Sequence, residues 1–248
     1  MAFKDHFSTQ ASAYRDFRPQ YPDALFSYLA TQTSTHQVAW DCGCGNGQAA
    51  VSLAKHFEHV IATDASAKQI EQQIPHNRVE YRVVPAEQSE LDDQSIDLVT
   101  VALALHWFDH ARFYTEVQRV LKPGGILAVW CNQLLRGEAA INELIDDYYQ
   151  NIVGPYWPAE RRSVENGYRD LDFPFEEIEP PAFEMVTHWD RNQLMGYLGS
   201  WSASQYYQKQ NHNNPLHLID AAMKNIWPEA SEIKIFTWPI NLRLGRYT

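Results

Sequence analysis

Hydrophobic runs alternate regularly with helix-like segments between residues 36 and 131. Five short apolar runs are separated by turns and by segments whose apolar residues recur at helical spacing. The runs are Val38–Trp40, His59–Thr63, Val79–Val84, Ile96–Leu103 and Ile126–Trp130. Most of them are largely apolar and do not alternate strictly with polar residues, which is typical of strands that are covered on both faces. The pattern therefore predicts βαβ units and a largely parallel sheet with helices on both faces.

The segments between these runs predict the covering helices. Helices are expected over about residues 24–30, 48–57, 67–73 and 109–121. Asp109 stands at the start of the last one, where its side chain can accept a bond from a free backbone N–H. Lys122-Pro123-Gly124-Gly125 follows and has Pro and Gly where a type II turn requires them.

The regular alternation ends after Cys131. Helices are expected over about residues 137–153, over 191–208 as one or two helices, and over 215–226. Phe183–Trp189 alternates like a strand, and Ile233–Leu244 predicts one final strand or a hairpin. Pro-containing loops are expected around residues 172–175 and at Pro180-Pro181.

Three glycines at alternate positions follow the first predicted strand. The segment reads Asp41-Cys42-Gly43-Cys44-Gly45-Asn46-Gly47 and leads into a predicted helix. Glycine allows a sharp turn and a close approach of the backbone to a ligand, and the helix start offers free N–H groups. Dinucleotide enzymes carry G-x-G-x-x-G instead and place a pyrophosphate on the helix. Asp41 would repel a pyrophosphate, but it suits a ligand with an ammonium group and one carboxylate, such as a methionine moiety.

Two further polar positions follow the next strands. Asp64 ends the second run, and a carboxylate there can accept bonds from both hydroxyls of a ribose, as it does in NAD sites. Ala86 and Glu87 follow the third run, where Glu87 is placed either to reach an adenine amino group or to serve as an ordinary capping residue.

Charge and composition limit the partners. With 20 Lys and Arg against 31 Asp and Glu, the formal net charge is −11, so nucleic acid is not expected as a partner. No apolar stretch reaches 18 residues and the first residues lack an apolar core, so we expect neither a membrane partner nor a secretory signal. The odd set Cys42, Cys44 and Cys131 favours a reducing cytoplasm over disulfides and does not fit a zinc site, so no metal is expected.

Taken in order, these motifs resemble the class I S-adenosylmethionine-dependent methyltransferases, in particular the type-11 group. The glycine loop, Asp64, Ala86-Glu87 and the turn at residues 121–127 correspond to that family's motifs over roughly residues 36–131. The flanks resemble the trans-aconitate methyltransferase branch. They include Tyr14-x-x-x-Arg18-Pro19-x-Tyr21-Pro22 and Ala104-Leu105-His106-Trp107-Phe108.

The resemblance implies a doubly wound, Rossmann-like, seven-stranded mixed α/β sheet, mostly parallel with an antiparallel last hairpin and a small helical cap. It also implies one methyltransferase domain over residues 1–248, with S-adenosylmethionine as cofactor. Residues 36–131 would be the cofactor-binding core, residues 1–30 an N-terminal lid, and residues 132–182 and 190–228 the substrate cap. A monomer or a weak homodimer is expected.

Methyl transfer from a sulfonium is an in-line displacement, so it depends on orientation and needs a base only when the acceptor carries a proton to be removed. Ligands bind at the carboxyl ends of strands in open α/β sheets. We therefore expect Leu103 to contact the cofactor and His106 to orient the acceptor or act as a base, unless it is only structural. Trp107 would flank the adenine or the acceptor.

The remaining predicted contacts come from the lid and the cap. Tyr14 and Arg18 would fold over the cofactor. Aromatic side chains of the cap would line the acceptor pocket, although packing within the cap explains each of them equally well. They are Tyr156, Trp157, Tyr168, Trp201, Tyr206 and Tyr207. Arg161 and Arg162 could attract the carboxylate of an acceptor, or they could be an ordinary pair of solvent-exposed charges.

The acceptor stays open at this point. A small molecule, with a carboxylic acid as the first choice, is the first expectation, and a protein or RNA substrate is the alternative. A nicotinamide-dependent oxidoreductase is disfavoured by the glycine spacing and by Asp41. A non-catalytic binding module is the remaining class, and the intact glycine loop gives it no support.

Overall fold

The computed structural model describes residues 19–248, which form an eight-stranded mixed sheet flanked by helices. The strand order is β3-β2-β1-β4-β5-β8-β6, with β7 also paired to β8. The strands are β1 (Val38–Cys42), β2 (His59–Asp64), β3 (Val79–Val83), β4 (Ile96–Ala102), β5 (Leu121–Asn132), β6 (Glu176–Ile178), β7 (Phe183–Trp189) and β8 (Lys234–Arg246). Strands β1 to β5 pair in parallel, and β8 is antiparallel to its three neighbours.

The helices follow the predicted alternation in the first half of the chain. They are α2 (Asp23–Thr31), α3 (Gln48–Leu53), α4 (Ala67–Ile70), α5 (His110–Val120), α6 (Ala139–Asp147), α7 (Arg161–Glu165), α8 (Arg191–Gly199), α9 (Ser202–Asn211) and α10 (Asp220–Ile226). Single turns lie at η1 (Leu105–Trp107), η2 (Tyr148–Ile152), η3 (Gly154–Tyr156) and η4 (Pro215–Leu218). Asp109 caps α5 as predicted, because its carboxylate accepts the N–H of Arg112 at 3.3 Å.

Two hydrophobic clusters confirm that helices cover both faces of the sheet. Neighbouring residues of a strand point to opposite faces, so Ala39 joins one cluster and Trp40 the other. The first cluster packs α2, α3 and the cap helices against the sheet, and the second packs α5 and α7. The predicted α/β class is therefore confirmed.

Several elements differ from the predicted ones. The eighth strand is the three-residue β6, which lies between two predicted loops where no element was predicted, so the sheet has one strand more than the seven expected. The helix predicted over 48–57 already ends at Leu53. Residues 122–125 form an irregular part of β5, in which the pairing with β4 jumps from Leu121 to Ile126 and Gly124 has a φ of +78°.

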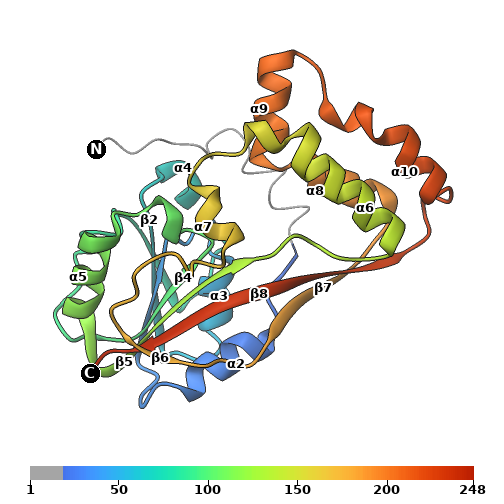
Figure 1. Cartoon of the computed structure of the whole chain (residues 1–248). Helices are drawn as coiled ribbons and strands as arrows, with labels where there is room; N and C mark the ends of the chain where they lie inside the picture. The colour runs from blue at the N-terminus through green and yellow to red at the C-terminus, as the bar shows by residue number, and fades with distance from the viewer. Residues whose placement is uncertain (1–18) are drawn as a thin grey trace.

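The cap is built by segments far apart in the chain. Helices α6, α8, α9 and α10 gather beyond one end of the sheet, on the upper right of Figure 1. The predicted helix over 215–226 is divided into η4 and α10, and 191–208 contains the two helices α8 and α9. β8 connects the two regions, since its first half pairs with β7 beneath the cap and its second half pairs with β5 in the core.

Candidate functional site

The glycine loop lies at the carboxyl end of β1, against the end of β2. The N–H of Gly43 donates to the carbonyl of Thr63 at 2.8 Å. The N–H of Gly45 donates to Oδ2 of Asp64 at 2.9 Å. Asp64 therefore ends β2 and also fixes the middle of the loop, so the two predicted cofactor motifs form one unit.

All three glycines of the loop have positive φ, namely +69° at Gly43, +56° at Gly45 and +91° at Gly47. Side-chain-bearing residues rarely adopt this region. A Cβ at Gly47 would lie 2.1 Å from the Tyr81 hydroxyl oxygen, whereas a Cβ at Gly45 would meet only Gln69 Oε1, at 3.8 Å. Packing within the protein thus requires Gly47, while the space beside Gly45 remains open for a ligand.

Asp41 is a fully buried acid directly before this loop. Its Oδ1 accepts the hydroxyl of Thr100 at 2.9 Å, and its Oδ2 has no hydrogen-bond partner among residues 19–248. Burial raises the pKa of Asp41 to about 7, against the opposing effect of the Thr100 bond, and the nearby Asp64 carboxylate adds to the rise. A cation at the loop would favour the ionised form of Asp41, and a pyrophosphate would oppose it.

Both carboxylate oxygens of Asp64 accept backbone N–H groups. Its Oδ1 accepts the N–H of Ser66 at 2.8 Å, and its Oδ2 accepts the N–H of Gly45. Each carboxylate oxygen can accept two hydrogen bonds. A carboxylate at this strand end has the acceptor chemistry that the two hydroxyls of a ribose require.

The two residues predicted on the adenine side differ in their surroundings. Ala86 is buried in the cluster that packs α5. Glu87 Oε1 accepts the backbone N–H of Asp109 at 2.8 Å, so this carboxylate ties the end of β3 to the start of α5. That bond favours the capping role for Glu87, and contact with adenine stays a prediction.

Leu103 follows β4 with a φ of +56°, an unusual conformation for a branched side chain. Its N–H donates to the carbonyl of Trp130 on β5 at 2.9 Å, which holds the turn against the sheet. Strained non-glycine residues of this kind cluster at functional sites. The turn delivers the chain to η1, which carries His106 and Trp107.

His106 is mostly enclosed and contacts aromatic rings. Its Nδ1 lies 3.0 Å from the hydroxyl of Tyr168, and its ring is stacked on that tyrosine, with centroids 6.1 Å apart. The Trp107 ring lies 4.7 Å from the His106 ring, in a tilted arrangement. Burial lowers the pKa of His106 to about 3, with smaller contributions from Arg161 and His110. The imidazole is therefore neutral at pH 7.

The cap contributes an aromatic cluster with one cation. Trp201 is nearly fully buried and packs against Trp157 and Tyr149, at ring separations of 5.6 and 5.7 Å. The guanidinium of Arg161 lies over the Trp157 ring, 4.1 Å from its centroid, and donates to the Tyr149 hydroxyl at 3.1 Å. Burial of Trp201 favours a packing role, whereas Trp157 and Arg161 are only partly buried.

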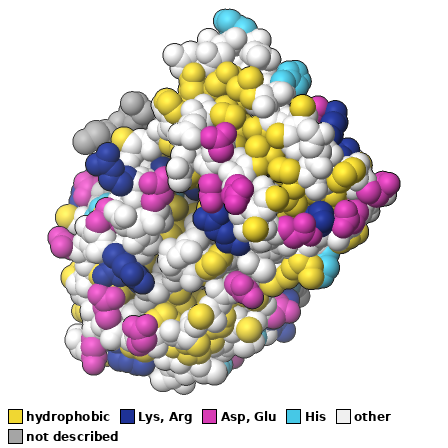
Figure 2. Space-filling model, turned by 45° about the vertical axis from the view of Figure 1, so that its right-hand side comes forward, with side chains coloured by type: hydrophobic (Ala, Val, Ile, Leu, Met, Phe, Trp, Pro, Cys, Tyr) yellow, Lys and Arg dark blue, Asp and Glu magenta, His cyan; other side chains and the backbone are white. Residues whose placement is uncertain are grey.

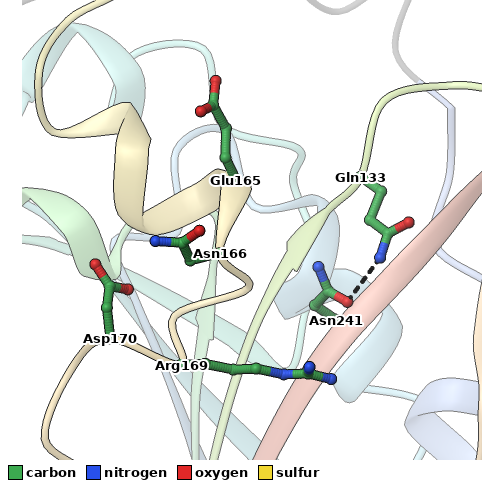
Figure 3. Close-up of a pocket in the computed structure, with 6 residues that line it drawn as sticks. All are labelled: Gln133, Glu165, Asn166, Arg169, Asp170 and Asn241. Atoms are coloured by element: carbon green, nitrogen blue, oxygen red, sulfur yellow. Dashed lines mark hydrogen bonds between the residues drawn. The ribbon is translucent and has the colours of Figure 1, made fainter.

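A polar cavity of about 500 Å³ lies on the α7 side of the sheet. Figure 3 shows Gln133 and Asn241 on the sheet side facing the α7 segment, which supplies the other four lining residues. These are Glu165, Asn166, Arg169 and Asp170. Tyr168 belongs to the same segment, but its side chain points inward to His106.

Some predicted contacts lie outside the described residues, and some useful ones were not predicted. Tyr14 and Arg18 precede residue 19, so their predicted roles as a lid are not addressed by the structure. Sequence reasoning did not single out Thr100 as the partner of Asp41 or Tyr168 as the partner of His106. A glycine directly before Tyr168 was the one local signal, since Gly167 and Tyr168 share an unusual backbone conformation.

The comparisons with known proteins decide the family. Residues 40–129 match the family model described as a methyltransferase domain. Over 236 residues the chain is 34% identical to a protein of Dictyostelium discoideum named as a methyltransferase, a match that covers 93% of this chain and 85% of that protein. This chain belongs to the S-adenosylmethionine-dependent methyltransferases.

Two further relatives agree with this assignment. The methyltransferase is 28% identical over 242 residues to a protein of Saccharomyces cerevisiae named as an S-adenosylmethionine-dependent methyltransferase, with 83% of each chain covered. It also superposes with a TM-score of 0.89 on the structure of a protein from Anaeromyxobacter dehalogenans described as a type II methyltransferase. That match has 41% identity and covers 93% of this chain and 98% of the other.

The chemistry of the loop fits the cofactor of this family. S-adenosylmethionine carries an ammonium group, a ribose diol and no phosphate. The buried Asp41 carboxylate with one unpaired oxygen suits the positive charge, Asp64 suits the diol, and the open side of Gly45 suits close approach of the ligand. Within residues 19–248 there is no group of three or more His, Cys, Asp or Glu side chains placed to hold a metal ion. The same residues include no helix with the length and apolar character needed to cross a bilayer.

Proposed function

We propose that this methyltransferase acts on a small molecule that presents an anionic oxygen, with a carboxylic acid as the first choice and O-methylation as the reaction. One observation carries the proposal. The guanidinium of Arg161 lies on the Trp157 ring at 4.1 Å, where it also lowers the pKa of the enclosed His106. The guanidinium of Arg161 is fixed on an aromatic ring and lies near the neutral imidazole of His106, which can donate a hydrogen bond. Such a pair of groups is suited to hold a small anion.

The cofactor would be held by the residues that the sequence predicts. Gly43, Gly45 and Gly47 would cradle the methionine part, with Asp41 supplying negative charge behind them. Asp64 would take the ribose hydroxyls. Ala86, Glu87 and Leu103 would border the adenosine, and Tyr14 and Arg18 would close over it from the N-terminal lid. When bound, S-adenosylmethionine supplies an electrophilic methyl carbon on a positively charged sulfur.

The residues of this chain would contribute orientation and the exclusion of water. A carboxylate is already ionised at pH 7, so its oxygen can form the new bond to carbon without losing a proton. The acceptor oxygen has to lie about 3–3.5 Å from that carbon, in line with the sulfur. His106 and Arg161 would set this geometry, and Trp107, Trp157 and Trp201 would form or support the apolar wall around the acceptor.

The resemblance of the flanks to the trans-aconitate methyltransferase branch supports a carboxylate but does not name the acid. A protein acceptor is the second possibility. RNA is disfavoured by the net charge of −11. On the face shown in Figure 2, acidic and basic side chains are interspersed, without a continuous basic stripe. We propose a monomer or a weak homodimer in a reducing compartment such as the cytoplasm, with residues 36–131 as the cofactor core and 132–182 and 190–228 as the cap.

The test combines an acceptor screen with a pair of neighbouring variants. Small carboxylic acids, phenols and amines are offered together with S-adenosylmethionine, and formation of S-adenosylhomocysteine is measured. For the best acid, Arg161→Met should raise KM at least about tenfold, because a charge-assisted contact is lost. Arg162→Met is the matched control, since Arg162 is an exposed neighbour on the same helix, and it should leave KM unchanged. Methylation of amines alone, or equal effects of the two variants, would refute the proposal.

A further inference from the structure

Tyr168 adopts a backbone conformation that is unfavourable for a tyrosine. Its φ is +60°, and the preceding Gly167 has a φ of +64°. A bulky aromatic residue in this region is a genuine outlier. The side chain of Asn241 fills the space where a Cβ of Gly167 would lie, at 2.9 Å. The two consecutive left-handed residues turn the chain sharply so that the Tyr168 ring enters the protein.

Several contacts hold this conformation in place. The N–H of Tyr168 donates to the carbonyl of Ser163 at 2.8 Å. Arg243 on β8 donates to the carbonyls of Tyr168 and Leu171, at 2.6 and 2.8 Å. Arg243 is in turn paired with Glu177 at 2.8 Å. The segment is thus fixed from both sides, and the Tyr168 side chain is fully buried.

The only side-chain hydrogen-bond partner of the Tyr168 hydroxyl within residues 19–248 is His106, whose Nδ1 lies 3.0 Å away. The hydroxyl stays protonated, because burial raises the pKa of Tyr168 well above its usual range. Its proton is buried with the rest of the side chain and therefore needs an acceptor.

The neutral imidazole supplies that acceptor. If Nδ1 carried the ring proton, the hydroxyl proton of Tyr168 would be buried without a partner, which proteins avoid. With Nδ1 as the acceptor, both groups are satisfied. The ring proton is then on Nε2, the nitrogen that points away from Tyr168.

We propose that Tyr168 is a positioning residue that fixes His106 in the Nε2–H form, so that His106 donates a hydrogen bond to the acceptor and does not act as a base. This inference rests on the proposed function, in which His106 faces the acceptor. It sharpens the substrate class to acceptors that arrive already deprotonated, because Nε2 has no free electron pair with which to remove a proton. A carboxylate meets this requirement, whereas an ammonium group does not.

The tautomer is measured directly by nitrogen-15 NMR of the imidazole rings in the cofactor-free protein. The His106 signals are assigned by their loss in His106→Gln. We expect a protonated Nε2 and an unprotonated Nδ1 at pH 7, and a mixture of both forms in Tyr168→Phe. Tyr114→Phe is the matched control, since it removes another buried phenol hydroxyl, one that has no hydrogen-bond partner among residues 19–248, and it should leave the His106 signals unchanged.

Turnover gives a second, independent readout. In a His→Gln variant the amide nitrogen can occupy roughly the position of Nε2, and in a His→Asn variant it can occupy roughly the position of Nδ1. His106→Gln should therefore retain kcat within about tenfold, and His106→Asn should lose at least another tenfold. In the wild type, kcat for a carboxylate should be constant between pH 6 and 8, because burial keeps His106 neutral and its neighbours Arg161 and His110 act in the same direction.

The outcomes separate the two proposals. A protonated Nδ1 in the wild type would overturn the assignment of Tyr168, whatever the acceptor is. Equal loss in His106→Gln and His106→Asn, with a kcat that rises with pH, would indicate a base and would also overturn it. The expected tautomer together with no methylation of any carboxylate would leave the role of Tyr168 standing and refute the proposed acceptor.

Discussion

Oδ2 of Asp64 accepts the backbone N–H of Gly45 at 2.9 Å, so the acid at the end of β2 and the turn after β1 are one structural unit. Replacing Asp64 by alanine removes this bond and the proposed ribose contacts together. Because hydrogen bonds to a charged group contribute about 1.5–3 kcal/mol, the Kd for S-adenosylhomocysteine should rise at least about tenfold. Isothermal titration calorimetry measures it. Asp23→Ala, which removes an exposed acid paired with Lys55, should leave the Kd unchanged.

The two glycines at Gly45 and Gly47 should respond differently to the same substitution. In Gly47→Ala the new methyl group collides with the Tyr81 ring, so this variant should be strongly destabilised. In Gly45→Ala the methyl group has space in the protein and costs about 1–2 kcal/mol through the left-handed backbone. This variant should fold and yet bind S-adenosylhomocysteine at least tenfold more weakly. Thermal unfolding and calorimetry give both quantities, and full affinity in Gly45→Ala would show that no ligand approaches there.

Cofactor affinity should depend on pH through Asp41. Its pKa of about 7 lies above the ordinary value of 3.8, because burial disfavours the charged form. The stability that the protonated form contributes to the ligand-free protein is fully present below about pH 4 and is lost as the pH rises through 7. A bound ammonium group favours the ionised form, so affinity for S-adenosylhomocysteine should increase from pH 6 to pH 8, with release of a proton.

Asp41→Asn tests this relationship. The substitution removes the titrating group, so affinity should fall and should no longer change between pH 6 and 8. The ligand-free variant should also unfold at a higher temperature than the wild type at pH 8, since a buried amide costs less than a buried unpaired charge. A wild-type affinity that is the same at both pH values would contradict the proposed electrostatic role.

Stability toward acid should depend on Glu116. Burial raises the pKa of its carboxyl, but bonds from Arg119 and Ser89 outweigh that effect and lower the pKa to about 2. The resulting stability is present above the unfolded value near 4.5 and is lost as the pH falls toward 2. Glu116→Gln should therefore lower the free energy of unfolding at pH 7, and the difference from wild type should shrink at pH 3. Urea titrations measure it, with the exposed Glu58→Gln as a control that shows no such difference.

The sequence predicts the elements of residues 36–131 better than those of the cap, for a physical reason. Strands such as β4 are buried on both faces, and this leaves a continuous apolar run that can be read directly. β6 has three residues, two of them exposed acids, and becomes a strand only because β8 offers it an edge to pair with. No local pattern carries that information, since the partner lies almost 70 residues away along the chain.

The same distinction applies to the site. Asp41, Gly45 and Asp64 are close in sequence and belong to a pattern of strand ends, so their juxtaposition could be predicted. The pairing of His106 with Tyr168 joins residues 62 positions apart and depends on a left-handed turn. Such a contact is set by tertiary packing, and the sequence shows only a glycine and an aromatic residue.

The position of β8 has a consequence for engineering and for the evolution of new specificities. The last 15 residues of the chain contain β8. This single strand pairs with β5 in the core and with β7 beneath the cap. If the cap of a relative were transplanted without its own C-terminal strand, its β7 would have no partner strand. The β5 edge would also stay unpaired and exposed. Recombination between such enzymes should succeed when the crossover keeps residues 132–248 together as a single inherited block.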